Sequence, residues 1–145
     1  MTSIQELIPV LQIAIGPVIL ISGVGLLLLS MTNRLSRVIE RARTLLAIPE
    51  SVSGLARRRV LAQIDILWVQ ARLIRVSILL ASTSVLFAAC LIIVLFVTAL
   101  FKIEDAWLVS ILFVACLLAL IGSLIAFITD INRSLTAFKV ELYER

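Results

Sequence analysis

The chain has 145 residues, 62% of them hydrophobic, and its mean hydropathy is +1.20. Soluble domains are only about 45–50% apolar, so this composition excludes a soluble globular protein. The length predicts a single domain. The net charge of +4 is therefore considered in terms of which side of the membrane the basic residues lie on.

Three apolar stretches are long enough to cross the hydrocarbon core of a bilayer, which takes about 20 helical residues. They cover about residues 8–31, 76–101 and 106–128. Their continuous Leu, Ile and Val runs lack the alternation of a membrane β-barrel, and backbone groups in lipid must bond within the chain. We therefore predict one all-α membrane domain over residues 1–145 with three transmembrane helices. No Lys or Arg precedes the first stretch, which favours a retained anchor over a cleaved signal peptide.

The basic residues predict the orientation of these helices. Nine arginines lie between the first two stretches, and Arg133, Lys139 and Arg145 follow the third. Only Lys102, in the short turn over residues 102–105, lies on the other side of the membrane. Because Lys and Arg concentrate on the cytoplasmic side, we expect the N-terminus outside and the C-terminus inside.

The cytoplasmic segment over residues 32–75 is predicted to be helical as well. Its apolar residues keep helical spacing, and the pattern breaks only between Pro49 and Gly54. We expect a first helix from about Ile4 to Ile48 and a second from about Leu55 to Leu100, each about 65 Å long at 1.5 Å per residue. Both would extend beyond the membrane as a cytoplasmic helical hairpin. The C-terminal tail has no proline or glycine, so the third helix is expected to continue too.

One face of the first helix carries notable residues at alternating steps of four and three, which is a heptad seam. The seam consists of Gln12, Gly16, Ile19, Gly23, Leu26, Ser30, Asn33 and Arg37. Small residues let backbones approach closely, and buried amides bond across helices where lipid offers no partner. The seam is therefore interpreted either as a packing face or as the lining of a pore between copies of the chain. In a pore, Ile19 and Leu26 would be dewetting constrictions.

The second and third apolar stretches carry stripes of small residues that suit tight antiparallel pairing. These stripes are Ser77, Ala81, Ser84 and Ala88 in one, and Ala115, Ala119, Gly122 and Ala126 in the other.

A polar cluster is expected where the three spans reach the cytoplasmic boundary. Asp130 is the only acidic residue at that level, and burying it unpaired in a membrane would be costly. We predict an ion pair from Asp130 to Arg34 or to Arg75. Such a cluster would act as a latch or ion site, or would consist of arginines reaching the surface beside one counter-ion.

The strongest charge run consists of Arg57, Arg58 and Arg59, at the tip of the predicted hairpin. Such runs are usually solvated, but this one is also a candidate site for an acidic partner or for lipid. The interleaved aromatic residues of an RNA-binding surface are missing, so no nucleic acid is expected as a partner. Arg72, near the lipid surface, is a candidate for contact with anionic headgroups.

Catalytic chemistry finds little support in the sequence. The chain has no histidine, and its two cysteines lie in apolar runs without metal-ligand spacing. No phosphate loop or dinucleotide fingerprint is present. We expect no enzyme, no cofactor and no metal site.

The segment ISGVGLLLLSMTNRLSRVIERARTL, residues 21–45, resembles a family of membrane proteins known as domain-of-unknown-function family DUF2721. Its most recognisable part is SMTNRLSRVIERARTL, residues 30–45, and the run Arg57 to Arg59 also fits. The likeness covers nearly the whole chain. It implies a multi-pass protein of a bacterial cytoplasmic membrane and implies no mechanism.

Together these features predict a homo-oligomer, because the three helices carry more faces suited to helix packing than a single three-helix bundle would bury. The first hypothesis for function is an ion channel lined by the first helix, whose inner arginines would favour anions. The alternative is a membrane-anchored scaffold or regulatory protein that binds a partner through the arginine-rich hairpin. In either case the expected partners are the bilayer, further copies of the chain, and ions or anionic lipid.

Overall fold

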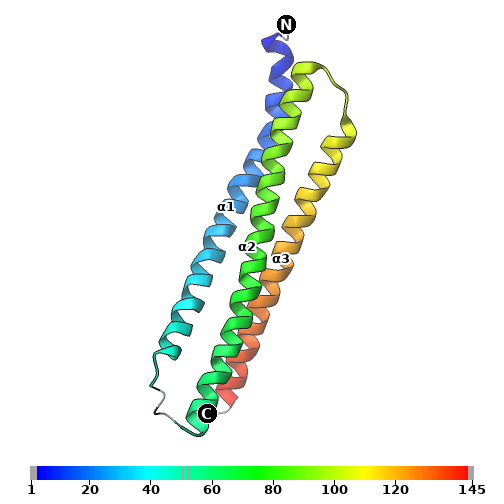
Figure 1. Cartoon of the computed structure of the whole chain (residues 1–145). Coiled ribbons are helices and arrows are strands. Elements are labelled where there is room, and N and C mark those ends of the chain that lie inside the picture. The colour runs from blue at the N-terminus through cyan, green and yellow to red at the C-terminus, as the bar shows by residue number, and fades with distance from the viewer. Residues whose placement is uncertain (1–2, 50, 52, 144–145) are drawn as a thin grey trace. The chain divides into compact units, whose positions relative to one another are not determined.

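The computed structural model describes residues 3–49, 51 and 53–143, so Arg145 lies outside the described residues. It contains three α-helices (Figure 1), which are α1 (Ile4–Leu46), α2 (Leu55–Phe101) and α3 (Ala106–Tyr143). The remaining described residues form the two connections between these helices and the short N-terminal lead into α1.

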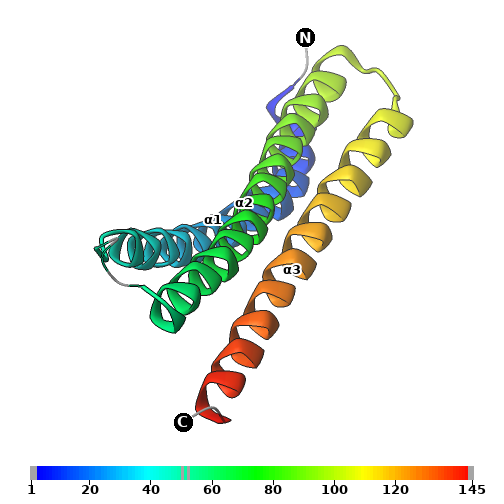
Figure 2. The same cartoon turned by 60° about the horizontal axis from the view of Figure 1, so that its bottom comes forward.

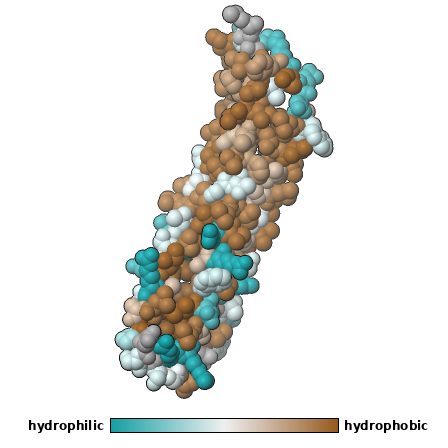
Figure 3. Space-filling view, viewed as in Figure 1, coloured by the Kyte–Doolittle hydropathy of each residue, from teal (hydrophilic) through white to brown (hydrophobic). Residues whose placement is uncertain are grey.

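All three helices are long and apolar enough to cross a membrane. The most apolar windows of α1, α2 and α3 have mean hydropathies of 2.4, 2.9 and 3.0, and only 11%, 17% and 11% of these windows is buried. Hydrophobic side chains accordingly cover most of the face seen in Figure 3. Contiguous apolar surface on this scale is not tolerated in water, so the chain is a multi-pass membrane protein.

Local chemistry explains where α1 ends. The helix stops at Leu46, two residues before the expected end, because the ring of Pro49 disfavours helical geometry in the residue that precedes it. The last turn tightens as the Ile48 N–H donates to the Leu45 carbonyl at 3.3 Å. Gly54, with a φ of 82°, then reverses the chain before α2.

The turn between α2 and α3 occupies residues 102–105, as predicted. Lys102 adopts the left-handed conformation, with a φ of 52°, and the Ile103 N–H donates to the Thr98 carbonyl at 3.0 Å. This bond across five residues is the Schellman arrangement that closes helix C-termini. The turn is therefore held in place by its own backbone.

The chain divides into two compact units, and all three helices contribute to both. Unit 1 consists of Met1–Leu28 and Leu79–Gly122, and unit 2 consists of Leu29–Ile78 and Ser123–Arg145. Within unit 1, α2 and α3 lie side by side and run in opposite directions (Figure 2).

The buried positions repeat every seven residues along each helix. They are Val24 and Met31 in α1, then Leu67, Ile74, Ser77, Ala81, Ser84, Ala88 and Leu91 in α2, and Cys116, Ser123 and Asp130 in α3. A strict repeat of seven is the pattern of left-handed helix packing with interlocking side chains. Each unit therefore has a coiled-coil type of core.

The small-residue stripe expected in α2 is fully buried, whereas the one expected in α3 is only half-buried. The buried stripe of α3 is one residue removed and consists of Cys116, Ser123 and Asp130. The expected α3 stripe consists of three alanines and Gly122, so it was chosen by side-chain size alone. Hydrogen bonding selects the polar stripe instead, because buried polar groups need partners.

Candidate functional site

The seam predicted on α1 faces away from the rest of the chain. All eight of its members are exposed, including Ile19 at 65% and Leu26 at 71%. A side chain added at Gly16 or Gly23 would meet no atom within 4 Å. We call this face, from Gln12 to Arg37, the outer seam of α1.

A second heptad series occupies the opposite face of α1, about 200° away around the helix. This inner seam consists of Val10, Ala14, Pro17, Ile21, Val24, Leu28, Met31, Leu35, Val38, Ala42 and Leu45, none of which is exposed. The inner seam provides the contacts of α1 within each unit. The outer seam is therefore left without a partner in the described part of the chain.

Polar groups make the outer seam unusual for a lipid-facing surface. The hydroxyl of Ser22, outside the seam, donates to the Val18 carbonyl at 3.2 Å. Among the described residues 3–49, 51 and 53–143, no hydrogen bond is made by the side chains of Gln12, Ser30 or Asn33. An amide in hydrocarbon without a partner costs several kcal/mol on transfer scales, or roughly 1–3 kcal/mol by mutational measures.

An ion pair in unit 2 joins Asp130 to Arg34, one of the two partners expected for it. Arg34 Nε lies 2.6 Å from Asp130 Oδ2, with side-chain exposures of 32% and 0%. Arg75, the other expected partner, is exposed. A buried carboxylate needs a counter-charge and further donors to offset its lost hydration, so this contact dominates the local energetics.

The ion pair belongs to a network that joins all three helices in unit 2. Arg34 Nη2 donates to Ser134 Oγ at 2.7 Å, and Ser134 Oγ donates to the Asp130 carbonyl at 3.0 Å. Gln70 Nε2, from α2, also donates to Ser134 Oγ, at 3.0 Å. Among the buried side-chain atoms of the described residues, only Asp130 Oδ1 has no hydrogen-bond partner.

The sequence prediction missed Gln70 and Ser134 as members of this network. The signal was available in the heptad pattern, because Gln70, Ser77 and Ser84 are spaced by seven residues, as are Cys116, Ser123 and Asp130. Polar residues that recur at core positions of two antiparallel helices are expected to meet in pairs.

Small polar side chains also form hydrogen bonds between α2 and α3. Ser84 Oγ donates to the Cys116 carbonyl at 3.0 Å, and Cys116 Sγ donates to the Ser84 carbonyl at 3.3 Å, both in unit 1. In unit 2, Ser123 Oγ donates to the Ser77 carbonyl at 2.7 Å. Side chains this small bring the backbones close enough for such bonds.

The three arginines of the charge run lie in the first turns of α2 and are all exposed. Beside them, a shallow groove of about 150 Å³ runs between the end of α1 and the start of α2 in unit 2. Its apolar lining includes Leu46, which is 67% exposed, and Leu61, which is 51% exposed. Arg57 lies at its edge.

Arg72 lies over the ring of Trp68, with the guanidinium carbon 5.7 Å from the ring centroid. Trp68 is 62% exposed, and Arg72 and Arg75 are exposed on the same helix. An aromatic ring under an arginine is typical of the zone between lipid and water.

Comparison with known proteins identifies a family. A family model described as "Protein of unknown function (DUF2721)" matches residues 14–140. No curated protein and no solved structure matches the chain. The family match spans the outer seam from Gly16 onward, the polar network and the charge run.

Proposed function

We propose, for a chain that belongs to the DUF2721 family of proteins of unknown function, that it assembles as a homo-oligomeric ion channel with the outer seam of α1 at the centre. The observation that carries this proposal is the exposure of all eight seam residues, while the inner seam is covered. A face with glycines and polar side chains at heptad spacing suits close helix association in lipid. Copies of the chain are the partners that are always available in the same membrane.

A conduit would have to run between copies rather than through one of them. The buried positions of each unit are filled by packed side chains. In the assembly, Gln12 and Ser30 would face the pore, and Ile19 and Leu26 would narrow it to a hydrophobic gate. Arg37 would place positive charge at one mouth and favour anions there.

The orientation proposed for the assembly places Arg37 and the hairpin over residues 32–75 in the cytoplasm. It rests on the basic residues, all but one of which lie in the predicted cytoplasmic segments. Within this arrangement the chain carries out no catalytic step and holds no cofactor.

Mass and flux measurements test the channel. Native mass spectrometry of the full chain in detergent is expected to give a ring of four or more copies, and vesicles containing it are expected to pass small anions. Ile19→Ser should raise the flux about threefold or more, because it removes a hydrophobic constriction.

Ile15→Ser is the matched control for this change. Ile15 and Ile19 are both exposed on α1, at 55% and 65%, but Ile15 lies outside the outer seam. A monomer or dimer without flux, or equal effects of both substitutions, would overturn the channel.

A second candidate function is favoured by the groove between Leu46 and Leu61 with its three neighbouring arginines. Apolar side chains exposed in water beside a basic run suit an amphipathic acidic helix of a soluble partner. In this case the spans would serve as an anchor, and the hairpin would be the working part of the protein.

Replacing Arg57, Arg58 and Arg59 by glutamine separates the two functions. A scaffold should lose its partner, measured by co-purification from the native membrane fraction, while flux through a channel should hardly change. Arg41→Gln together with Arg43→Gln removes exposed arginines of α1 and serves as the control.

A further inference from the structure

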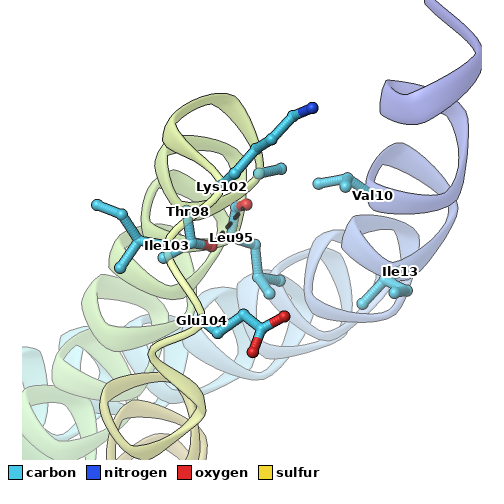
Figure 4. Close-up of a pocket in the computed structure, with 8 residues that line it drawn as sticks. Val10, Ile13, Leu95, Thr98, Lys102, Ile103 and Glu104 are labelled. Atoms are coloured by element: carbon cyan, nitrogen blue, oxygen red, sulfur yellow. Dashed lines mark hydrogen bonds between the residues drawn. The ribbon is translucent and has the colours of Figure 1, made fainter. Parts of the chain in front are cut away.

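Unit 1 contains a groove lined by residues from α1, from α2 and from the turn that follows α2. It has a volume of about 430 Å³ and opens between the start of α1 and the end of α2 (Figure 4). Val10 and Ile13 of α1 face Leu95 of α2 across it, and the turn after α2 forms its rim with Lys102 and Glu104. The floor is therefore apolar, and the rim carries one charge of each sign.

Along the membrane normal, this groove is expected to lie at the edge of the hydrocarbon core. The apolar stretch of α2 ends at Phe101, and the polar residues Lys102, Glu104 and Asp105 follow immediately. Trp107, which is 75% exposed, comes next and has the amphipathic ring typical of the interfacial zone. The molecules that fill such a zone are phospholipids, with acyl chains on one side and headgroups on the other.

The backbone of the rim is fixed by a helix-capping turn, which places Lys102 at the edge of the groove. Lys102 occupies the left-handed position at which helices usually end in glycine, and the bond from Ile103 to Thr98 secures it. Lys102 Nζ lies 3.8 Å from Glu6 Oε2, with side-chain exposures of 70% and 52%. A contact this long and exposed contributes little, so the ammonium is available to a ligand.

The local charge selects among phospholipid headgroups. The turn carries Glu104 and Asp105 after the basic residue Lys102, Glu6 of α1 adds a third carboxylate close to it, and all four residues are exposed. Among the described residues, Glu104 and Asp105 have no ion pair. An excess of carboxylates repels an anionic headgroup and attracts one that carries a positive charge.

The lining distinguishes the two common cationic groups. A trimethylammonium group is recognised by aromatic faces, and none of the eight lining residues is aromatic. A primary ammonium instead donates hydrogen bonds to carboxylates. We propose that this groove binds a phospholipid of the ethanolamine class, with its phosphate on Lys102, its ammonium on Glu104 and an acyl chain over Val10, Ile13 and Leu95.

Native mass spectrometry of the full chain tests the site. The protein is titrated with three phospholipids that share acyl chains and carry ethanolamine, choline or glycerol headgroups. The dissociation constant of the ethanolamine lipid is expected to be at least about threefold lower than those of the other two lipids. A difference of this size corresponds to the free energy of one exposed ion pair. Glu104→Gln should abolish this preference, and Ala99→Leu, which fills the groove, should weaken binding of all three lipids.

Matched controls are Glu40→Gln and Ala62→Leu, at exposed positions of α1 and α2 outside the groove. Circular dichroism and the mass of the assembly report whether each variant folds. Should Ala99→Leu fail to fold, Glu104→Gln in the exposed turn still decides the question. Equal binding of the three lipids, a preference for the glycerol lipid, or a preference unchanged in Glu104→Gln would each overturn the proposal.

Discussion

At the scale of single residues, Asp130 is the position at which the energetic demand is greatest. Its side chain is fully buried, and one oxygen depends on Arg34 while the other has no partner. Removing one member of a buried ion pair is far more costly than removing both, because a lone buried charge remains. The pair therefore ties the rotation of α1 to α3 in unit 2.

Asp130→Asn is expected to lower the free energy of unfolding by about 2 kcal/mol, less than for a fully buried pair because Arg34 is partly exposed. Arg34→Met alone should also lower stability, and the double variant Arg34→Met, Asp130→Asn should lose less than the sum of the two single changes. Denaturant titration in detergent, followed by circular dichroism, measures all three. Asp65→Asn, at an exposed position of α2, should change stability by less than about 0.5 kcal/mol; additive losses would contradict the coupling.

At the scale of one element, α1 carries two heptad faces with different roles. The inner seam packs within the chain, and the outer seam is left exposed. Its polar members have a reason to be covered by another protein, since lipid cannot bond them. The outer seam of α1 is therefore the surface on which the proposed assembly depends.

Gly23→Leu and Gly25→Leu form a matched pair on α1. Both glycines have open space around them, and both changes raise helix propensity, by about 1 kcal/mol. Only Gly23 lies in the outer seam, where leucine would hold neighbouring backbones apart. We expect Gly23→Leu to raise the dissociation constant of the oligomer at least about tenfold, measured by sedimentation equilibrium in detergent. Similar effects of both changes would show that another face mediates assembly.

At the scale of the whole molecule, the predicted orientation places the two interhelical connections on opposite sides of the membrane. The connection after α1 would be cytoplasmic because arginines flank it, and the turn at residues 102–105 would be outside. This orientation would determine which side of the membrane the two mouths of the proposed pore, the hairpin and the groove beside Lys102 face.

Cysteine labelling checks the orientation. In a background of Cys90→Ala and Cys116→Ser, which keeps a donor toward Ser84, a thiol is introduced by Glu104→Cys or by Ser53→Cys. A membrane-impermeant maleimide should label the first only in right-side-out vesicles and the second only in inverted ones. Labelling of both positions from one side would contradict the topology.

Helix ends were predictable to within two residues because they depend on local chemistry. Pro49 and Gly54 end one helix and precede the next, and the polar turn at residues 102–105 separates two apolar runs. The α2 stripe from Ser77 to Ala88 was also correct, since small residues at heptad spacing rarely face lipid without reason. The α3 stripe from Ala115 to Ala126 is half-buried, and the fully buried positions of α3 lie beside it at Cys116, Ser123 and Asp130, because side-chain size gave no information about which polar groups would pair.

The sequence by itself determined the class of protein, the three membrane-spanning helices and their bounds, since hydropathy and helix breakers act over short stretches of chain. Only the tertiary structure decided which heptad face of α1 turns inward and that Asp130 meets Arg34 rather than Arg75. Both faces of α1 have the same period, and both arginines lie near the same boundary. The choice depends on how each helix is rotated about its axis, which is fixed by contacts between residues far apart in sequence.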